Sequence, residues 1–351
     1  MSDGAIPFGD CPVPIADTEE ILLGHGSGGK LTARLVEDIL LPAFRNPALE
    51  ALDDQAIVAI GGSRIAFTTD SYVVTPIFFP GGDIGELAVN GTVNDLAMGG
   101  ARPLFLSLAF ILEEGFPLAD FRRVVESARR AAARAEVSVV TGDTKVVNRG
   151  SGDKVFVNTS GIGLVPPGVD LSSRRVTPGD EILLSGSIGD HGVAILSKRE
   201  GIEFEGEVRS DTAPLYGLVA ATLAAAPATH AMRDPTRGGV AATLVEISSR
   251  RKVGIELDEN AVPVRDVVRG ACEILGLDPL LVANEGKLVA FVPEEEAPAA
   301  LAAMRGHPLG RDAARIGRVT REHPGVVVAK TPIGGKRILD LPFGEVLPRI
   351  C

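Results

Sequence analysis

The chain has 351 residues, a net charge of −11 at pH 7 and 45% hydrophobic residues. A single hydrophobic core rarely grows to this length, so two domains are expected. The acidic balance, without any long run of Lys and Arg, argues against a nucleic-acid phosphate backbone as the partner. No stretch reaches about 18 uninterrupted apolar residues, so no membrane-spanning helix is predicted.

The three cysteines, at positions 11, 272 and 351, are odd in number and widely spaced. Because no CxxC pair is present, neither a zinc knuckle nor a disulfide framework is indicated. The N-terminal segment has no basic stretch followed by an apolar one, so no secretory signal is predicted. These features together predict a reducing, cytoplasmic location.

In the first half, an apolar helical pattern follows a glycine-rich loop, and strands then alternate with helices. Gly61-Gly62 separate two short apolar runs, which predicts a hairpin. Pro117 stands near the start of a strongly amphipathic pattern, where its missing N–H costs no helical bond. We expect helices over 31–44, 84–98 and 117–135, and strands over 56–60, 64–69, 104–112, 137–141 and 155–165.

Residues 165–180 concentrate Pro, Gly and Ser and predict a domain boundary. Beyond it we expect helices over 190–199, 212–226, 238–250, 264–275 and 294–304, and strands over 181–185, 287–292, 313–319 and 325–330. Helices and strands mix in both halves, which predicts an α+β fold built from α/β layers. We divide the chain into an N-terminal segment (1–17), an N-terminal domain (18–168), a C-terminal domain (169–332) and a flexible tail (333–351). The pair Gly334-Gly335 is a candidate hinge for this tail.

The sequence GHGSGGK at 24–30 is a candidate phosphate loop. Gly24, Gly29 and Lys30 fit the pattern G-x-x-x-x-G-K, but Leu31 stands where a P-loop has the Ser or Thr that binds Mg²⁺. A glycine-rich anion-binding loop of another kind is favoured over a P-loop. A flexible turn is the alternative that these residues leave open.

Four acidic positions follow or interrupt apolar runs: Asp54 within Asp53-Asp54, Asp70 in TTDS, Asp95 in VNDLAMGG and Asp143 in GDTK. A single aspartate at the end of a strand or helix is usually a turn or cap residue. Mg²⁺ takes hard oxygen ligands and bridges them to nucleotide phosphates. The residues alone leave a Mg²⁺ site and a set of structural caps about equally favoured.

Several long runs resemble the HypE family of hydrogenase maturation factors. They are GHGSGGK, TTDSYVVTPIFFPGGDIGELAVNGTVNDLAMGGARP, FILEEGFP, TGDTKVVNRG, SGSIGDHGVAIL, MRDPTRGGVAATLVEIS, NEGKL and the closing PRIC. The resemblance covers nearly the whole chain, in order. It implies the two-domain fold of the aminoimidazole ribonucleotide synthetase and selenophosphate synthetase superfamily, in which an N-terminal sheet domain forms a homodimer and an α/β sandwich domain follows.

The resemblance also implies a reaction and its partners. In the family, the carbamoyltransferase HypF loads a carbamoyl group onto the C-terminal cysteine, which here is Cys351. ATP with Mg²⁺ then drives dehydration of this group to a thiocyanate. The cyano group passes to the HypC–HypD iron-carrier complex, for the active site of nickel-iron hydrogenase.

Site residues follow from the same motifs. The resemblance implies proton handling by Lys145 in GDTK and Glu285 in NEGKL. It implies that Mg²⁺ and ATP are held by Asp54, Asp70, Asp95 and Asp143, with further nucleotide contacts from His25, Gly26, Ser27, Gly28, Gly29 and Asn94.

Two other cysteines need an interpretation. Cys272 lies in an apolar helical pattern, VVRGACEILGL, which is typical of a core residue. Cys11 in CPVP invites comparison with the reactive N-terminal Cys or selenocysteine of selenophosphate synthetase. That enzyme pairs its nucleophile with a nearby lysine, whereas the first lysine here is Lys30, so a catalytic Cys11 is disfavoured.

Several polar residues of the second half remain candidates without an assigned role. His191 in GDHG is either a phosphate contact or a capping or packing residue. Arg233 and Arg237 in MRDPTRGG are candidate contacts of the tail or the nucleotide. In the same run, Asp234 and Thr236 resemble a helix cap.

Two other functions compete with a cysteine-tailed dehydratase. One is a small-molecule kinase or synthetase of the same superfamily, against which the PRIC terminus and the missing Cys–Lys pair argue. The other is a scaffold that presents its tail but has a dead nucleotide site, against which the intact acidic positions argue.

Overall fold

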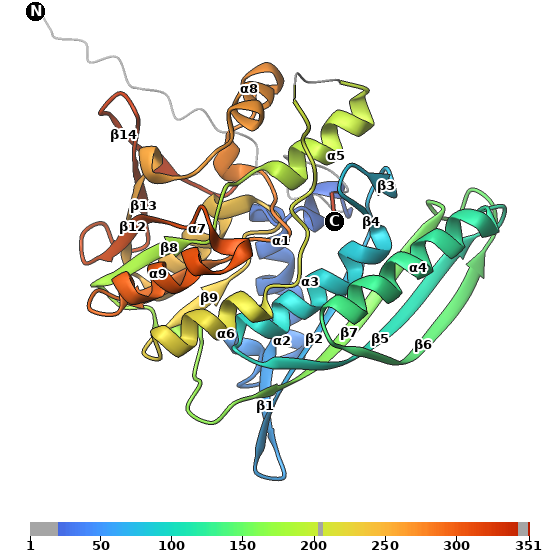
Figure 1. Ribbon diagram of the computed structural model, residues 1–351, viewed down its shortest axis with the longest axis horizontal. Helices are drawn as coiled ribbons and strands as arrows, with labels where there is room; N and C mark the ends of the chain where they lie inside the picture. Colours follow the sequence, from blue (N-terminus) through green and yellow to red (C-terminus); the bar gives the residue numbers. More distant parts are fainter. Residues whose placement is uncertain (1–19, 203–205, 343–349) are drawn as a thin grey trace, which may run out of the picture.

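The computed structural model describes residues 20–202, 206–342 and 350–351 (Figure 1). The predicted N-terminal segment 1–17, with Cys11, lies outside the described residues. Two sheets, each with its own helices, form the two halves of the molecule. Among the described residues, no helix is long and apolar enough to cross a membrane.

The N-terminal half is built on a five-stranded sheet in the order β1-β2-β7-β5-β6. Neighbouring strands are antiparallel except β5 and β6, which are parallel and joined by helix α4. A small hairpin of β3 and β4 precedes α3. The bounds are β1 Ala56–Ile60, β2 Ser63–Tyr72, β3 Phe78–Phe79, β4 Gly82–Asp83, α3 Ile84–Met98, β5 Arg102–Glu113, α4 Leu118–Arg134, β6 Ser138–Val147 and β7 Val155–Val165.

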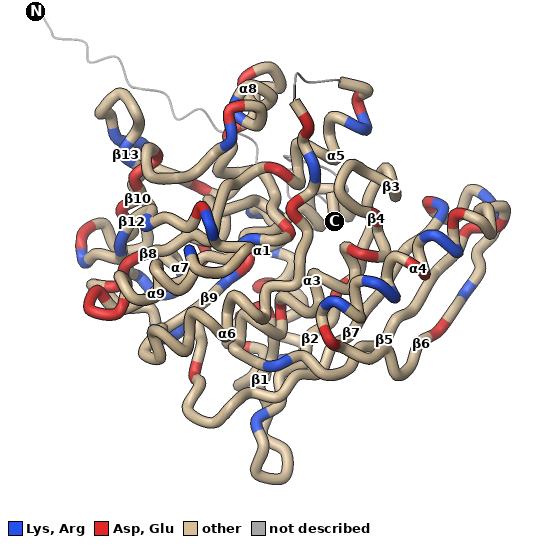
Figure 2. The backbone as a smooth tube through the Cα atoms, viewed as in Figure 1, with Lys and Arg blue, Asp and Glu red and all other residues tan. Residues whose placement is uncertain are grey.

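Helices α3 and α4 cover one face of this sheet. The Asp83 side chain caps α3 by accepting from the amides of Gly85 and Glu86. Almost every side chain of α3 is buried, because α3 contacts the sheet, α4 beside it and elements of the C-terminal half. A Cβ at Gly85 would lie 2.2 Å from the Val124 carbonyl oxygen, so the close crossing of the two helices requires glycine there. The arginines of α4 are exposed, and the blue segments of the tube in Figure 2 mark their positions along the helix.

The other face of the N-terminal sheet is open. Phe67, Ile162 and Phe105 lie side by side on β2, β7 and β5, because Ile162 pairs with both phenylalanines. Phe67 is 46% exposed, Ile162 is 41% exposed and Phe105 is 45% exposed. A monomer thus presents a continuous apolar row on this face, of the kind that marks an interaction surface.

The C-terminal half is built on a seven-stranded mixed sheet in the order β14-β13-β10-β12-β8-β11-β9. One hydrophobic core lies between this sheet and α7, and a second lies between its other face and helices α6 and α9. The bounds are β8 Asp180–Leu184, α5 Asp190–Glu200, α6 Tyr216–Ala225, β9 Ala231–Arg233, α7 Gly239–Arg251, β10 Gly254–Asp258, α8 Asp266–Leu275, β11 Val289–Pro293, α9 Ala297–Gly306, β12 Ala314–Thr320, β13 Val327–Lys330 and β14 Lys336–Leu339. The α+β class with two domains is confirmed.

The predicted helix 31–44 is not one continuous α-helix. It consists of α1 (Lys30–Arg34), a π-helical turn (Leu35–Leu40) and α2 (Leu41–Phe44). Pro42, near the start of α2, has no N–H to donate to the preceding turn, so regular α-helical bonding is interrupted before α2.

The predicted tail boundary at 333 is too early. Strand β14 pairs antiparallel with β13, and Lys336 lies opposite Lys330. The Gly334-Gly335 pair forms the turn between them, where the Thr331 amide donates to the Gly335 carbonyl at 2.9 Å. The candidate hinge is therefore part of the C-terminal sheet.

Candidate active site

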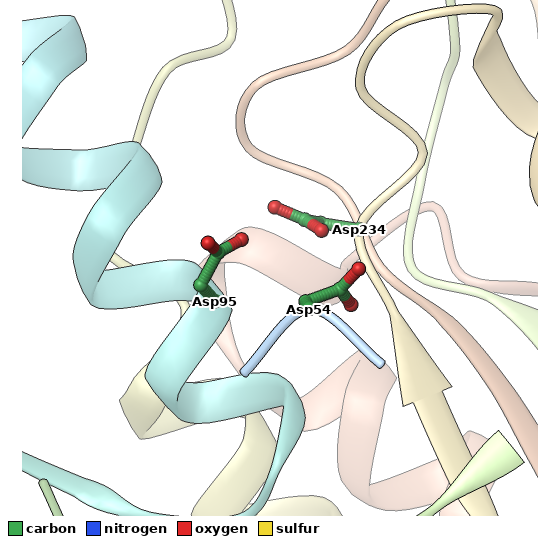
Figure 3. A group of neighbouring side chains, drawn as sticks. All are labelled: Asp54, Asp95 and Asp234. Atoms are coloured by element: carbon green, nitrogen blue, oxygen red, sulfur yellow. The ribbon is translucent and has the colours of Figure 1, made fainter. Parts of the chain in front are cut away.

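Three carboxylates from separate parts of the chain meet where the two halves join (Figure 3). Asp54 precedes β1, Asp95 lies in the last turns of α3, and Asp234 directly follows β9. One ligand oxygen from each lies within 4.8 Å of the others. We call Asp54, Asp95 and Asp234 the acidic trio.

The electrostatics of the acidic trio favour a bound cation. Burial raises the pKa of Asp54 and of Asp95 well above the usual range, and neighbouring carboxylates add to the shift at Asp95. Burial also raises the pKa of Asp234 to about 6, against the opposing effect of Arg233. The Asp54 Oδ2 atom is buried without a hydrogen-bond partner. A hard divalent cation would satisfy this oxygen and offset the repulsion, so the residues fit Mg²⁺.

The acidic trio lines a cleft of about 370 Å³ between the two halves. Gly28, Gly29 and Asp70 line it from the N-terminal half, and Arg237 lines it from the C-terminal half. Gly28 has φ +79°, and a Cβ there would lie 2.9 Å from the Arg237 Cβ. The glycine loop therefore approaches the arginine closely, as a loop that surrounds an anion requires.

The chain end lies beside this cleft. The Val73 amide donates to the Cys351 oxygen at 3.1 Å, and His191 Nε2 lies 2.8 Å from the Ile350 carbonyl oxygen. Ile350 is 3% exposed and packs in the core that includes Phe79. Burial of such a side chain contributes about 1.5–3 kcal/mol. Burial raises the pKa of the Cys351 thiol to about 12, so the docked thiol is uncharged at neutral pH.

Glu285 is the carboxyl group with the largest effect on the pKa of the Cys351 thiol. It is 3% exposed, and its Oε1 atom is buried without a hydrogen-bond partner. Burial raises its pKa well above the usual range, and neighbouring carboxylates add to the shift while Arg237 opposes it. The Cys351 side chain lies close enough to Arg237 for its ionised form to raise the pKa of this arginine. Arg237 thus lies between the tail and the cleft, in agreement with the predicted contact between this arginine and the tail.

The structure brings most of the predicted residues to one place. Cys351 and Glu285 lie together, and the cleft beside them is lined by Gly28, Gly29, Asp54, Asp70 and Asp95. Asp70 accepts from the Tyr72 hydroxyl at 3.0 Å and is not a member of the acidic trio. Arg233 forms an ion pair of 2.6 Å with Asp54.

Three residues of the glycine loop, His25, Gly26 and Ser27, form contacts within the protein outside the cleft. The Leu22 amide donates to His25 Nδ1, and the Ser27 hydroxyl donates to the Gly24 carbonyl. The Gly26 carbonyl accepts from Arg237 at 2.8 Å. None of His25, Gly26 and Ser27 lines the cleft as described, so their predicted nucleotide contacts find no support in this geometry. Lys30 pairs with Asp340 on the surface, which argues against a P-loop.

Asn94 is not a cleft residue, contrary to the predicted phosphate contact. It is 1% exposed, and its amide group donates to the carbonyls of Ala213 and Glu285. Its Oδ1 accepts from the Leu215 amide at 2.8 Å. Because its donors and its acceptor are used by backbone groups, Asn94 braces the two halves against each other.

Asp143 and Lys145 lie apart from the cleft within one chain. Their side chains form an ion pair of 2.8 Å and are 63% and 69% exposed. They stand opposite Ala109 and Ile111 of β5, so they share the open face of the N-terminal sheet with Phe105. Within one chain, Asp143 is therefore too far from the cleft for its predicted metal role, and Lys145 is too far for its predicted proton-handling role.

Sequence reasoning missed Asp234 as a candidate ligand. The run RDPTRGG favoured a helix cap, yet Asp234 is 7% exposed and completes the acidic trio. The clustering of charged residues and glycines in this run was the available signal. Cys272, predicted to be a core residue, is 1% exposed and packs between α5 and α8.

Comparisons with known proteins agree with this architecture. Family models of AIR synthase related proteins match residues 52–165 (N-terminal domain) and 177–330 (C-terminal domain). "Carbamoyl dehydratase HypE" of Azotobacter vinelandii is 57% identical, over 93% of this chain and 96% of its own. A crystal structure of HypE in complex with ATP has a TM-score of 0.80 at 51% identity and covers 95% of this chain and 100% of its own. A crystal structure of a HypE–HypF complex has a TM-score of 0.83 at 48% identity, and the match covers 88% of this chain and 99% of the chain in that structure. The chain therefore belongs to the HypE family, whose two halves are AIR synthase related domains.

Proposed function

We propose that this protein uses ATP to dehydrate a carbamoyl group carried on Cys351 to a thiocyanate, which supplies a cyanide ligand of the nickel-iron hydrogenase active site. The observation that carries the proposal is the position of the chain end. Cys351 lies beside Glu285 and Arg237, next to the cleft that holds the acidic trio. The name of the Azotobacter vinelandii relative supports the same reaction.

The cleft is our candidate site for ATP. Asp54, Asp95 and Asp234 would hold Mg²⁺, which supplies charge neutralisation for the phosphates when it is bound. The amide of Gly29, together with Arg237, would orient the γ-phosphate toward the chain end. The ATP complex of a 51% identical relative supports this nucleotide.

The reaction balances with ATP alone. The carbamoyl oxygen attacks the γ-phosphorus, the bond from that phosphorus to the β–γ bridging oxygen breaks, and ADP leaves. The nitrogen then loses its two protons as the carbon–oxygen bond breaks and inorganic phosphate leaves, which forms the nitrile. Phosphoryl transfer depends mainly on positioning and charge neutralisation, so the residues of this chain need to hold the reactants and accept protons.

We further propose a homodimer through the open face of the N-terminal sheet. The apolar row of Phe67, Ile162 and Phe105 supports it. In such a dimer, Asp143 and Lys145 would face the second copy, which is where their proposed roles in nucleotide binding and proton handling would be met. Lys145 or Glu285 would then accept the nitrogen proton.

The dimer is tested by Ile162→Lys. A charge in the middle of the apolar row should convert the dimer into a monomer, because an unpaired charge is costly in an apolar interface. Light scattering coupled to size exclusion measures the mass. Ile274→Lys on α8, which replaces an isoleucine that is 73% exposed, is the matched control and should leave the mass unchanged. A monomeric wild type, or a dimeric Ile162→Lys variant, would overturn this interface.

The proposed partners are the carbamoyltransferase HypF, as the HypE–HypF complex of a relative supports, and the HypC–HypD iron carrier. Both would act on the same residue in the cytoplasm. The Cys351 tail would therefore have to leave the cleft to meet either one.

Mass spectrometry of the intact protein tests the function. With HypF, carbamoyl phosphate and ATP, wild type should gain one carbamoyl group and then lose one water, and Cys351→Ser should show neither change. A wild type that gains no adduct beside an active HypF would refute the dehydratase. Nucleotide-dependent phosphorylation of a small molecule by Cys351→Ser would point instead to a kinase of the same superfamily.

A further inference from the structure

The described end of the chain is held by one side-chain hydrogen bond that the proposed reaction does not use. His191 Nε2 lies 2.8 Å from the carbonyl oxygen of Ile350. The other hydrogen bond to the chain end comes from the backbone amide of Val73, which only a substitution to proline would remove. His191 is 0% exposed and is not among the residues that line the cleft.

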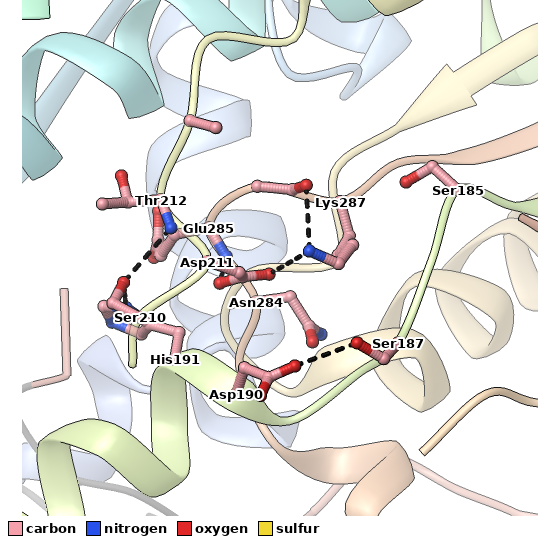
Figure 4. A network of polar contacts seen from close by, with 12 residues as sticks. Ser185, Ser187, Asp190, His191, Ser210, Asp211, Thr212, Asn284, Glu285 and Lys287 are labelled. Carbon is pink, nitrogen blue, oxygen red and sulfur yellow. Dashed lines mark hydrogen bonds and ion pairs between the residues drawn. The ribbon is translucent and has the colours of Figure 1, made fainter. Parts of the chain in front are cut away.

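The surroundings of His191 fix its tautomer. A carbonyl oxygen only accepts, so Nε2 carries the proton toward Ile350. The Ser210 hydroxyl lies 2.8 Å from Nδ1 and therefore donates to it, while the same hydroxyl oxygen accepts from the Thr212 amide at 3.2 Å (Figure 4). The Phe79 ring packs edge-on against the imidazole, with the centroids 5.7 Å apart. Burial lowers the pKa of His191, which keeps the ring neutral.

The segment that orients His191 also supports Glu285. Ser210 donates to the imidazole, and the next residue, Asp211, accepts from the Glu285 amide at 3.0 Å (Figure 4). Lys287 forms an ion pair of 3.0 Å with Asp211. The contact to the tail and the candidate base are thus both held by neighbouring residues, Ser210 and Asp211, of one segment of the chain.

We propose that His191 is a positioning residue for the chain end: its Nε2–H bond to Ile350 holds the C-terminal residue beside Glu285, and its loss releases the tail. The purpose of this docking rests on the proposed function, whereas the docking itself does not. Removing the donor leaves the buried Ile350 carbonyl unpaired in the docked state, so the docked fraction falls.

The test measures the exposure of Cys351 in the full-length protein without nucleotide. A pulse of iodoacetamide is followed by peptide mass mapping of Cys351 and Cys272. His191→Asn should speed Cys351 alkylation about tenfold, because its shorter amide does not reach Ile350. His191→Gln places an amide N–H near the position of Nε2 and should react at close to the wild-type rate. Cys272 is 1% exposed and should stay unreactive in both variants if they fold.

Equal Cys351 rates in His191→Asn and His191→Gln, with Cys272 protected, would overturn the proposal. If Cys272 reacts in His191→Asn, the variant has unfolded, and Ser210→Ala decides instead: it loses the donor to Nδ1 and should speed Cys351 alkylation while Cys272 stays protected. An unchanged Cys351 rate in Ser210→Ala would then count against the positioning role.

A second readout separates this inference from the proposed function. Carbamoyl loading by HypF needs the released tail and should be unchanged or faster in His191→Asn, while loss of water should slow about tenfold. If no carbamoyl group is loaded even on wild type, the proposed function fails, but the alkylation result on tail docking stands. Slowed loading together with unchanged alkylation would contradict the positioning role.

Discussion

Replacing Asp95 by asparagine is expected to lower Mg²⁺-dependent ATP turnover by about 100-fold or more, because a direct ligand should matter at least as much as the outer-shell groups that orient ligands. The substitution removes one carboxylate oxygen of the acidic trio and one negative charge near the phosphates. The reaction relies on charge neutralisation, so turnover should fall even where ATP still binds. Turnover is measured as phosphate release with and without Mg²⁺.

Stability distinguishes a ligand from a structural residue at this position. Burial and neighbouring carboxylates raise the pKa of Asp95, so its ionised form is disfavoured in the empty site. The Thr68 hydroxyl donates to Asp95 at 2.7 Å, and an asparagine oxygen can still accept this bond. Without Mg²⁺, the unfolding temperature of Asp95→Asn should therefore equal or exceed that of wild type. The further rise on adding Mg²⁺ and ATP should be lost.

Asp53→Asn is the matched control for Asp95→Asn. Asp53 also lines the cleft, but it is not a member of the acidic trio, and its carboxylate accepts from the Ser172 hydroxyl at 2.7 Å and the Ser173 amide at 3.0 Å. Its loss should lower the unfolding temperature while Mg²⁺-dependent turnover persists. Unchanged turnover in Asp95→Asn would remove this residue from the metal site.

Much of the fold could be predicted because local patterns and tertiary packing agree. Helix α3 begins and ends at the predicted residues 84 and 98, since Asp83 caps it and Gly99-Gly100 end it. Helix α4 and strand β7 also follow their periodicity. Strand β14 was missed because Gly334-Gly335 and the charged Lys336 and Arg337 are typical of an exposed tail. Only pairing with β13 makes it a strand.

Only the site residues that stand in distinctive sequence motifs could be predicted. Asp54 and Asp95 stand in distinctive runs, and both belong to the acidic trio. Asp234 does not, because it reaches the trio by way of β9, a strand of three residues that no periodicity indicates. Asn94 lies one residue from Asp95 on α3 and therefore points elsewhere, toward the C-terminal half. Sequence spacing alone does not separate such neighbours.

Replacing Glu285 by glutamine is expected to leave carbamoyl loading and ATP binding intact and to slow loss of water by about 100- to 10,000-fold, the range for removal of a general base. Glutamine keeps the volume of the side chain. The hydrogen bonds that hold this segment are made by the backbone amide and carbonyl of Glu285. The substitution leaves both groups unchanged. The loss should therefore fall on the proton-accepting step alone.

The pH dependence gives the same residue a second signature. A carboxyl group accepts a proton only when it is ionised, so the rate of water loss should fall as the pH drops through its pKa. Burial raises the pKa of Glu285, which moves this fall to a higher pH than an ordinary glutamate would give. The fall should be absent from the residual rate of Glu285→Gln.

Single-turnover mass spectrometry of the carbamoylated protein measures the rate of water loss. Glu273→Gln, an exposed glutamate on α8, is the matched control and should lose water at the wild-type rate. If Glu285→Gln also loses water at that rate, Glu285 is not the base. The open face of the N-terminal sheet then becomes the place to look, because Lys145 of a second copy is the remaining candidate. Lys145→Met should in that case abolish water loss while carbamoyl loading continues.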